Sequence, residues 1–317
     1  AIAMLALFIY ATKKQTVYDD YTEAENVYTL KEYINEALEK YIEKGTYPWH
    51  MPGHKRNKAL LGIELPYDLD ITEIDGFDDL HHADGILKEE QERAARVFGA
   101  EESHFLVNGS TAGILSAVMG CTHRGDKILV ARHCHKSIYH AIYMNGLVPR
   151  YVYPEFDISM HMNGEISKED VAKALAAEPD IKAVVIVSPN YDGVVSDVKG
   201  IAEVAHSYRI PLIVDEAHGP HFGFHPAFPG RANDLGADVV INSLHKTLPS
   251  LTQTAILHIN GKLANRRRIK KYLDMLQSSS PSYIFMASLD ACVDFLDGKC
   301  EEAFELYVER LQKFREE

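Results

Sequence analysis

The sequence is short of basic residues, of cysteine and of long apolar runs. Its 317 residues hold 33 lysines and arginines against 46 aspartates and glutamates, and the net charge of −13 argues against nucleic acid or an anionic membrane as the main partner. The four cysteines include no C-x-x-C pair and are too few for a disulfide scaffold, so we expect a reducing compartment, the cytoplasm. The apolar run 2–10 is well short of the roughly 20 residues of a membrane-spanning helix and lacks the flanks of a secretory signal.

The remaining composition is that of an ordinary globular protein. Hydrophobic residues make up 46% and charged residues 25% of the chain, enough for a sizeable core. The length suggests two domains, or one large α/β domain with an extension. The chain starts at Ala1 and stops inside a helical pattern at 301–317, so we expect it to be a piece of a longer protein.

Two amphipathic helices are expected in the first hundred residues. Apolar side chains recur every three or four positions over 30–41, and Gly45 follows where a helix C-terminus favours glycine. A second helix fits 85–98, again closed by a glycine. The intervening segment 47–72 is rich in proline and glycine, which predicts an irregular arm rather than a separate domain.

Beyond residue 99, short apolar runs alternate with helical stretches. Some of these stretches carry helix caps, such as Ser167 with Asp170 three residues on. The alternation is typical of βαβ units, so we predict an α/β fold with a mainly parallel sheet flanked by helices on both faces. The expected strands are 105–107, 127–131, 148–153, 183–187, 211–214, 239–242 and 255–259.

Polar clusters follow four of the expected strands. Open α/β sheets bind ligands outside the carboxyl ends of their strands, so we expect one crevice to gather all four clusters. The clusters are 108–113, 188–193, 215–219 and 243–247.

The first cluster, 108–113, lies between a strand and a helical pattern. Backbone N–H groups at a helix N-terminus favour an anion, which makes the cluster a candidate phosphate site. The alternative, and taken alone the commoner case, is a plain turn with Ser110 or Thr111 as the N-cap. The string matches neither G-x-x-x-x-G-K-[ST] nor G-x-G-x-x-G, so nucleoside triphosphates and dinucleotides lack their usual support.

Two charged residues at strand ends extend this hypothesis. Asp215 ends an apolar strand, where a carboxylate costs desolvation unless it meets a cation or hydrogen-bond donors. Lys246 ends the next strand region and is either a solvated loop residue or a partly desolvated Schiff-base nucleophile. An anion site, an aspartate and a lysine on one sheet edge together suit pyridoxal phosphate, whose phosphate, ring nitrogen and aldehyde need those three partners.

Sixteen histidines invite a metal interpretation in two places. His133 and His135 flank a cysteine on an extended stretch, and His218, His221 and His225 are three and four residues apart. Glycines and prolines interrupt any helix over the second group, and no H-E-x-x-H string is present. We expect these histidines to stack on a ring or to hydrogen-bond, with satisfied structural roles as the alternative, rather than to bind a metal.

Several strings, in order between about 47 and 289, carry a specific resemblance. The sequence resembles the Orn/Lys/Arg decarboxylase family of fold-type I pyridoxal-phosphate enzymes. The strings are MPGHK at 51–55, DITE at 70–73, NGST at 108–111, HKS at 135–137, YDGVVSD at 191–197, DEAHG at 215–219, SLHKT at 243–247 and SSSP at 278–281.

The resemblance implies roles for four side chains that would act on the cofactor ring or the substrate. Lys246 forms the internal aldimine, and Asp215 pairs with the pyridine nitrogen and keeps it protonated, so that the ring acts as an electron sink. His135 stacks on the ring, and His218 lies near the phenolic oxygen or the substrate. The proton donor to the product is Lys246 or a neighbouring histidine.

The resemblance also implies a phosphate site and a second subunit. The stretch 278–280 reaches the phosphate site of a partner, which makes a homodimer or a higher homo-oligomer the competent form. The implied cofactor-binding residues are Ser110, Thr111, Ala112, His135, Asp215, His218, Ser243, His245, Lys246 and Ser279.

The family resemblance implies the decarboxylation of a basic amino acid in polyamine biosynthesis, with arginine as the expected substrate or else lysine or ornithine. We divide the chain into an N-terminal helical segment at 1–46, a cofactor-binding large domain at 47–290, and the start, at 291–317, of a helix that leads to a missing C-terminal domain. The early position of MPGHK resembles the short, biosynthetic type.

Two departures from the family strings are polar for polar, and we expect both to be tolerated. His133 stands where Asn is frequent, and Asn190 where Thr is common. Two alternatives stay open: another fold-type I pyridoxal-phosphate enzyme, such as an aminotransferase, aldolase or lyase, and a non-catalytic remnant that binds the cofactor without turnover.

Overall fold

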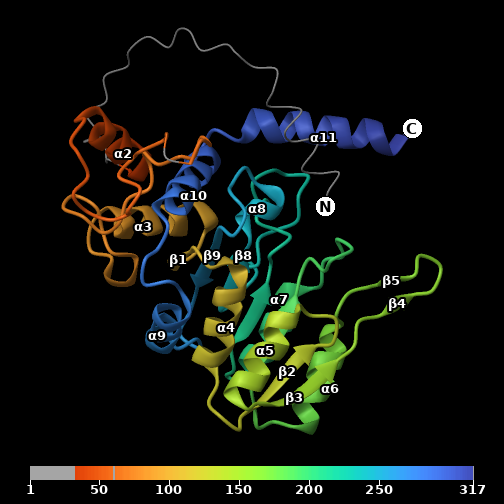
Figure 1. The fold of residues 1–317 in the computed structure, drawn as a ribbon. Helices are drawn as coiled ribbons and strands as arrows, with labels where there is room; N and C mark the ends of the chain where they lie inside the picture. Colours follow the sequence, from red (N-terminus) through yellow and green to blue (C-terminus); the bar gives the residue numbers. More distant parts are fainter. Residues whose placement is uncertain (1–32, 60, 317) are drawn as a thin grey trace.

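A seven-stranded sheet lies at the centre of the structure, a computed structural model that describes residues 33–59 and 61–316 (Figure 1). The strand order is β1-β9-β8-β7-β6-β2-β3. β9 runs antiparallel to β1 and β8, and the other pairs are parallel, which confirms the predicted mainly parallel sheet. The strands are β1 (Glu102–Leu106), β2 (Lys127–Ala131), β3 (Val148–Val152), β6 (Ile181–Val187), β7 (Leu212–Asp215), β8 (Val239–Asn242) and β9 (Ala255–Ile259).

The strands coincide with runs of apolar and β-branched residues. Such runs occur because both faces of the sheet are covered by helices. Every residue of β7, β8 and β9 is buried, and in β6 Lys182 alone is exposed. Continuous apolar runs of this kind are typical of parallel strands between helical layers. All seven expected strands are present, and the main difference is that β1 starts three residues earlier than predicted.

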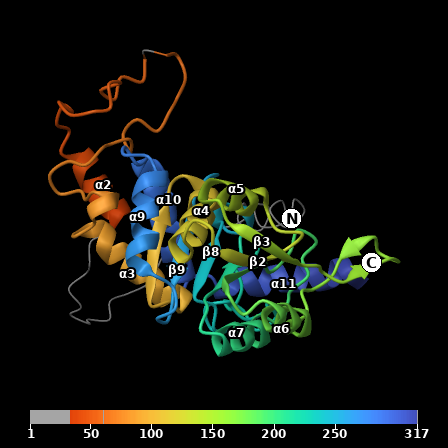
Figure 2. The same cartoon turned by 90° about the horizontal axis from the view of Figure 1, so that it is seen from below.

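Helices cover both faces of the sheet, as Figure 2 shows from below. One face packs against α4, α5 and α9, and the opposite face around β6 and β7 packs against α6 and α7. The cap predicted at Ser167 is present, since its hydroxyl accepts the Asp170 amide at 3.3 Å. These helices are α4 (Gly109–Cys121), α5 (Lys136–Asn145), α6 (Lys168–Ala177), α7 (Val198–Ser207) and α9 (Arg266–Leu276).

A further helical layer packs at the β1–β9 end of the sheet. It consists of α2 (Ile34–Glu43), α3 (Ile86–Phe98) and α10 (Tyr283–Leu296). The irregular 47–72 stretch and the 3-10 turn η1 (Leu80–His82) connect α2 to α3. The predicted helix at 85–98 is confirmed as α3, and Gly99 ends it in the left-handed conformation at φ 66°. The first helix begins at Ile34, and the part predicted before residue 33 lies outside the described residues, as does the apolar run 2–10.

A buried ionic cluster ties these three helices together. Arg93 Nη2 donates to Glu90 Oε1 at 3.0 Å and to Asp290 Oδ1 at 2.7 Å, and the guanidinium lies 3.7 Å from the centre of the Tyr33 ring. Asn35 donates from its backbone N–H and its side chain to the same Asp290 carboxylate, at 2.8 and 2.7 Å. Burial and the negative charge of Asp290 raise the pKa of Glu90, so Arg93 and Asp290 form the charged pair.

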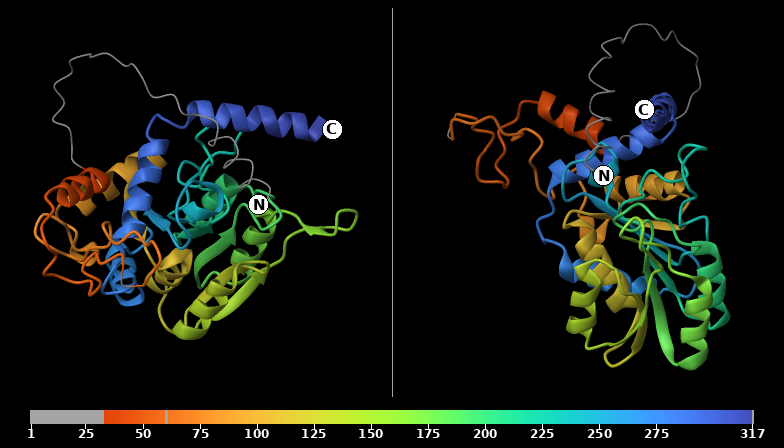
Figure 3. Two further views of the ribbon diagram at one scale, coloured as in Figure 1. Left: turned by 45° about the horizontal axis from the view of Figure 1, so that its top comes forward. Right: turned by 90° about the vertical axis from the view of Figure 1, so that its right-hand side faces the viewer.

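Three features stand out from the sheet in Figure 3: the 47–72 arm, the hairpin of β4 (Phe156–Asp157) and β5 (Met162–Asn163), and α11 (Glu301–Glu316). The short helix α8 (Leu244–Thr247) follows β8, on the side of the sheet that faces α11 (Figure 1). Among the described residues no helix is both long and apolar enough to cross a membrane. The division of the chain at 46/47 and 290/291 stays a prediction.

Candidate active site

The carboxyl ends of β1, β6, β7 and β8 lie along one edge of the sheet. β6, β7 and β8 are parallel, and β1 has the same direction because β9, between β1 and β8, is antiparallel to both. The four polar clusters follow these strand ends, so the topology brings them to the same edge.

Lys246 lies on α8 with its amine directed at a histidine. Its Nζ is 3.0 Å from Nε2 of His218. Burial lowers the pKa of Lys246, while the negative charge of Asp215 opposes that shift. Burial and the positive charge of Lys246 lower the pKa of His218 to about 4, so His218 is neutral and accepts the hydrogen bond at Nε2.

Asp215 is the last residue of β7 and is 3% exposed. Its carboxylate accepts a hydrogen bond from the Ala217 amide at 3.2 Å. Burial raises the pKa of Asp215 to about 6, against the opposing effects of the Lys246 charge and the Ala217 N–H. A carboxylate so placed is stabilised by a second cation, such as the protonated nitrogen of a pyridine ring.

His135 presents a neutral ring to the same edge. It is the N-cap of α5, where Nδ1 accepts the Ser137 amide at 3.3 Å and lies 2.8 Å from the Ser137 hydroxyl. Because Nδ1 is an acceptor, the ring proton lies on Nε2. Burial and the charge of Lys246 lower the pKa of His135, which keeps the ring uncharged.

The N-cap of the helix that begins in the candidate phosphate site (108–113), here called the phosphate cluster, differs from the one considered in the sequence analysis. Asn108, not Ser110 or Thr111, is the N-cap, because Gly109 at φ 72° turns the chain into α4 one residue after it. Ser110 and Thr111 therefore lie in the first turn, half-buried and exposed respectively. The side chain of Ala112 is buried, so only its backbone N–H can serve an anion.

Ser243 and His245 flank the first residue of α8. Ser243 is fully buried, and His245 Nδ1 donates to the Thr254 carbonyl at 3.0 Å, which fixes the plane of its ring. Ser279 is exposed in the turn before α10. The neighbouring Ser278 amide donates to Asn108 Oδ1 at 3.1 Å, so this turn lies beside the phosphate cluster of its own chain. Contact of Ser279 with a partner subunit stays a prediction.

The polar atoms left over at this edge test whether a cofactor fits. Ser243 Oγ, His218 Nδ1 and His133 Nδ1 are buried and, in the part of the chain that the structure describes, have no hydrogen-bond partner. Unpaired buried groups of this kind cost free energy unless a ligand satisfies them. With the amides at the start of α4, the Asp215 carboxylate and the Lys246 amine, the donors and acceptors present fit pyridoxal phosphate.

Among the described residues, the two groups of histidines form no metal site. Within residues 33–59 and 61–316, no group of three or more His, Cys, Asp or Glu side chains could hold a metal ion. His218, His221 and His225 lie in an irregular stretch of turns, as the interrupting glycines and prolines predict. His225 Nε2 instead pairs with Glu305 of α11 at 2.8 Å.

Asn190, one of the two departures, organises the loop after β6. Its Oδ1 accepts the amides of Asp192 and Val194 at 3.0 and 2.9 Å, and its Nδ2 donates to the Asn163 carbonyl at 2.8 Å. Its side chain therefore holds this turn against the base of the β4–β5 hairpin.

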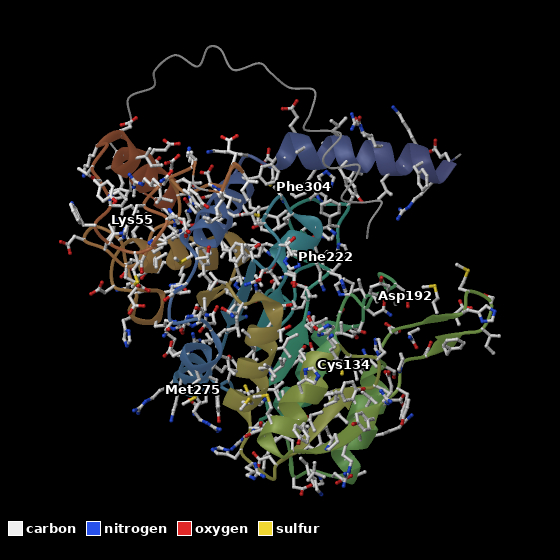
Figure 4. The ribbon with its side chains drawn as sticks, viewed as in Figure 1. Lys55, Cys134, Asp192, Phe222, Met275 and Phe304 are labelled. Carbon is white, nitrogen blue, oxygen red and sulfur yellow. The ribbon has the colours of Figure 1, made fainter. Side chains whose placement is uncertain are left out.

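Sequence reasoning missed a cavity and its far wall. A cavity of about 450 Å³ opens beside His218 and Thr247, and α11 closes one side with Tyr307 and Arg315. Figure 4 shows Phe222 and Asp192 at this level of the molecule, with Phe304 of α11 above them. Sequence reasoning also missed the contact between His221 and Thr247, whose side chains are 3.1 Å apart. Thr247 stands in the string at 243–247 and His221 in the histidine group considered for a metal, but no local pattern pairs positions so far apart in the sequence.

Comparison with known proteins agrees with this geometry. The profile of the family described as Orn/Lys/Arg decarboxylase, major domain, matches residues 33–317. The chain is 41% identical over 275 residues to the uncharacterized protein YaaO of Bacillus subtilis, which covers 85% of this chain and 57% of that protein. It is 39% identical over 261 residues to an arginine decarboxylase of the same bacterium, over 80% and 53% of the two chains. The chain thus spans about half the length of these curated relatives.

Solved structures show the same architecture. The constitutive lysine decarboxylase of E. coli superposes with a TM-score of 0.76 at 25% identity, over 89% of this chain and 43% of that one. A serine palmitoyltransferase of Sphingomonas wittichii superposes with a TM-score of 0.57 at 16% identity, over 84% and 59%, and shares the fold alone. The predicted fold-type I architecture is confirmed, and the profile match covers all the described residues. The chain therefore belongs to the Orn/Lys/Arg decarboxylase family, whose major domain it carries.

Proposed function

We propose that this chain is the cofactor-binding part of a pyridoxal-phosphate-dependent decarboxylase that acts on a basic amino acid. The observation that carries the proposal is the position of Lys246, whose buried amine lies 3.0 Å from His218 Nε2 and in the field of the Asp215 carboxylate. Arginine is the proposed substrate, since curated relatives named arginine decarboxylase are 37–40% identical to the chain.

Bound pyridoxal phosphate would supply an electron sink for the pair released when the carboxylate leaves Cα as carbon dioxide. Asp215 would hold the ring nitrogen protonated, because a buried carboxylate stabilises a cation that it contacts. Burial lowers the pKa of Lys246, so its amine would lose a proton to attack the aldehyde more readily than an exposed lysine. His218 would hold a proton shared with Lys246 Nζ, and His135 would lie against the ring face.

The remaining sequence hypotheses are kept as proposals. The phosphate would be held by Ser110, Thr111, Ala112, Ser243 and His245. Its negative charge would then lie against the backbone amides at the start of α4. Ser279 would contribute to the phosphate site of a partner subunit in a homodimer. A role in polyamine biosynthesis follows from the proposed substrate, and a reducing, cytoplasmic location is supported by four cysteines that are all free.

An absorption titration tests the proposed function. The purified protein is titrated with pyridoxal phosphate beside Lys246→Ala and the matched control Lys262→Ala, which removes an exposed lysine after β9. We expect a visible band of lysine-bound cofactor in the wild type and the control, and none in Lys246→Ala. Arginine, lysine and ornithine are then added separately while carbon dioxide is measured.

Each outcome has a defined meaning. Release of carbon dioxide from one amino acid identifies the substrate. A lysine-dependent band without carbon dioxide from any of the three would replace decarboxylation by another fold-type I reaction or by cofactor binding alone. A wild type without the band would overturn the assignment of Lys246.

A further inference from the structure

The chain between β7 and β8 forms a loop that is closed at both ends by Glu216. Glu216 Oε1 accepts the Ala232 amide at 2.9 Å, sixteen residues further on, and Oε2 accepts Asn242 Nδ2 at 3.0 Å. The same Asn242 side chain donates to the Glu216 carbonyl at 3.2 Å. The loop is therefore fixed to the end of β8, next to the start of α8.

Two side chains of this loop reach α8 in succession. His218 Nε2 meets Lys246 Nζ at 3.0 Å, and His221 Nδ1 meets Thr247 Oγ1 at 3.1 Å. α8 is a single turn of four residues. A helix of that length has too few internal hydrogen bonds to fix its own orientation, so contacts from outside decide where its side chains point.

The ring of His221 is buried and fixed by aromatic packing. It is 8% exposed, and the rings of Phe222 and Phe228 stand nearly perpendicular to it at 4.9 and 5.0 Å between centroids. Phe228 in turn packs edge-on against Phe304 of α11 at 5.3 Å. Burial lowers the pKa of His221 to about 4, so the ring is neutral and exchanges one uncharged hydrogen bond with the Thr247 hydroxyl.

We propose that His221 is a positioning residue for Lys246. Its hydrogen bond to Thr247 fixes the turn that carries Lys246, and thereby keeps Nζ against His218 Nε2 and in the field of Asp215. The inference rests on the proposed function, because Lys246 is the reacting amine there. His221 itself need not touch the cofactor or the substrate.

The test measures the pKa of Lys246 in the cofactor-free protein. An acylating reagent labels amines at a series of pH values, and peptide mass spectrometry reports Lys246 with the exposed Lys262 as internal reference. The titratable groups that face Lys246 are Asp215, His218 and His135. A merely structural role for His221 would leave this pH profile unchanged.

The variants separate the hydrogen bond from the packing. Thr247→Val removes the hydroxyl at constant shape, and His221→Phe keeps a ring while removing both nitrogens. We expect each to raise the pKa of Lys246 by about one unit, so that its labelling at pH 8 slows about tenfold, because the amine leaves its buried position. Thr247→Ser and His221→Asn, which keep a polar atom at the contact, should restore the wild-type profile.

The double variant decides whether the two residues act through one bond. His221→Phe with Thr247→Val should shift the profile no more than either change alone, and additive shifts would overturn the proposal. An unchanged profile in Thr247→Val would also overturn it. Thr247→Val is nearly isosteric, so it decides the matter if His221→Phe melts early. Failure of the proposed function is separately visible, as a wild type without the lysine-dependent band.

Discussion

Asp215 is a residue whose charge is unfavourable for the fold by itself. It lies at 3% exposure at the end of a fully buried strand, and burial raises its pKa to about 6. A group whose pKa is higher in the folded than in the unfolded protein stabilises the fold at low pH, and that stabilisation is lost as the pH rises through the folded value. The cofactor-free protein therefore tolerates an ionised Asp215 at neutral pH at a cost in stability.

We predict that Asp215→Asn stabilises the cofactor-free protein at pH 8. A pKa of about 6 against the ordinary 3.8 corresponds to roughly 3 kcal/mol of unfolding free energy, which the amide recovers by removing the charge. The gain should shrink as the pH falls below 6 and vanish near pH 3, as measured by urea denaturation. If the proposed function holds, the same variant should also lose decarboxylation, because the ring nitrogen would lose the carboxylate that keeps it protonated.

The matched control, measured at the same pH values, is Asp297→Asn, which changes an exposed aspartate in the turn after α10. It should change the unfolding free energy by less than about 0.5 kcal/mol at either pH. An Asp215→Asn protein that is less stable than the wild type at pH 8 would show that the carboxylate is satisfied within the fold.

The helices α2, α3 and α10 depend on one buried cation. Arg93 compensates Asp290, and Asn35 of α2 binds the same carboxylate. We predict that Arg93→Ala lowers the unfolding free energy by about 3–5 kcal/mol, because it leaves the buried charge of Asp290 without a cation. The control is Lys299→Ala, which breaks the exposed pair with Asp294 and should cost less than about 1 kcal/mol. Equal effects of the two variants in chemical denaturation would contradict this account.

The contact between α4 and α9 depends on a glycine. A Cβ on Gly120 would lie 2.8 Å from Ile269 Cα and 2.9 Å from its backbone nitrogen. We predict that Gly120→Ala destabilises the protein by about 1–3 kcal/mol, in spite of the better helix propensity of alanine. Gly230→Ala, where the nearest atoms are 3.8 Å away, should be nearly neutral. Thermal unfolding compares the two variants. Equal melting temperatures would contradict the prediction and would mean that α9 shifts to accommodate the added methyl group.

The elements themselves were predictable because burial shapes the local sequence. The runs of Val and Ile in β6 to β9 reflect a sheet covered on both faces, and the strand ends placed Asp215 and Lys246 on one edge. The N-cap of α4 was assigned wrongly in one interpretation, since the conformation of Gly109 is not visible in its identity alone. The pairing of His221 with Thr247 is a tertiary contact across 26 positions, which no local pattern encodes.

At the level of the whole molecule, the sheet and its helices form a dense body from which the β4–β5 hairpin projects (Figure 1). We predict that chymotrypsin cuts this hairpin early, after Tyr153 or Phe156, which are 66% and 57% exposed. Tyr143 is 87% exposed but lies in α5, so it should resist, because a protease needs an extended backbone. Mass spectrometry of the first fragments would contradict this if cleavage after Tyr143 came first.

The position of β9 in the sheet has a consequence for how the protein is made. Within the described sheet β1 pairs with β9 alone, and β9 is the last of the seven strands in the sequence. A nascent chain that has released β1 to β8 from the ribosome already contains the candidate phosphate site at 108–113, after β1, and the lysine after β8. The two cannot reach their final spacing until β9 inserts between their strands. The proposed cofactor should therefore bind a growing chain only after residue 259 has left the ribosome. Cofactor binding would then indicate that the sheet is complete.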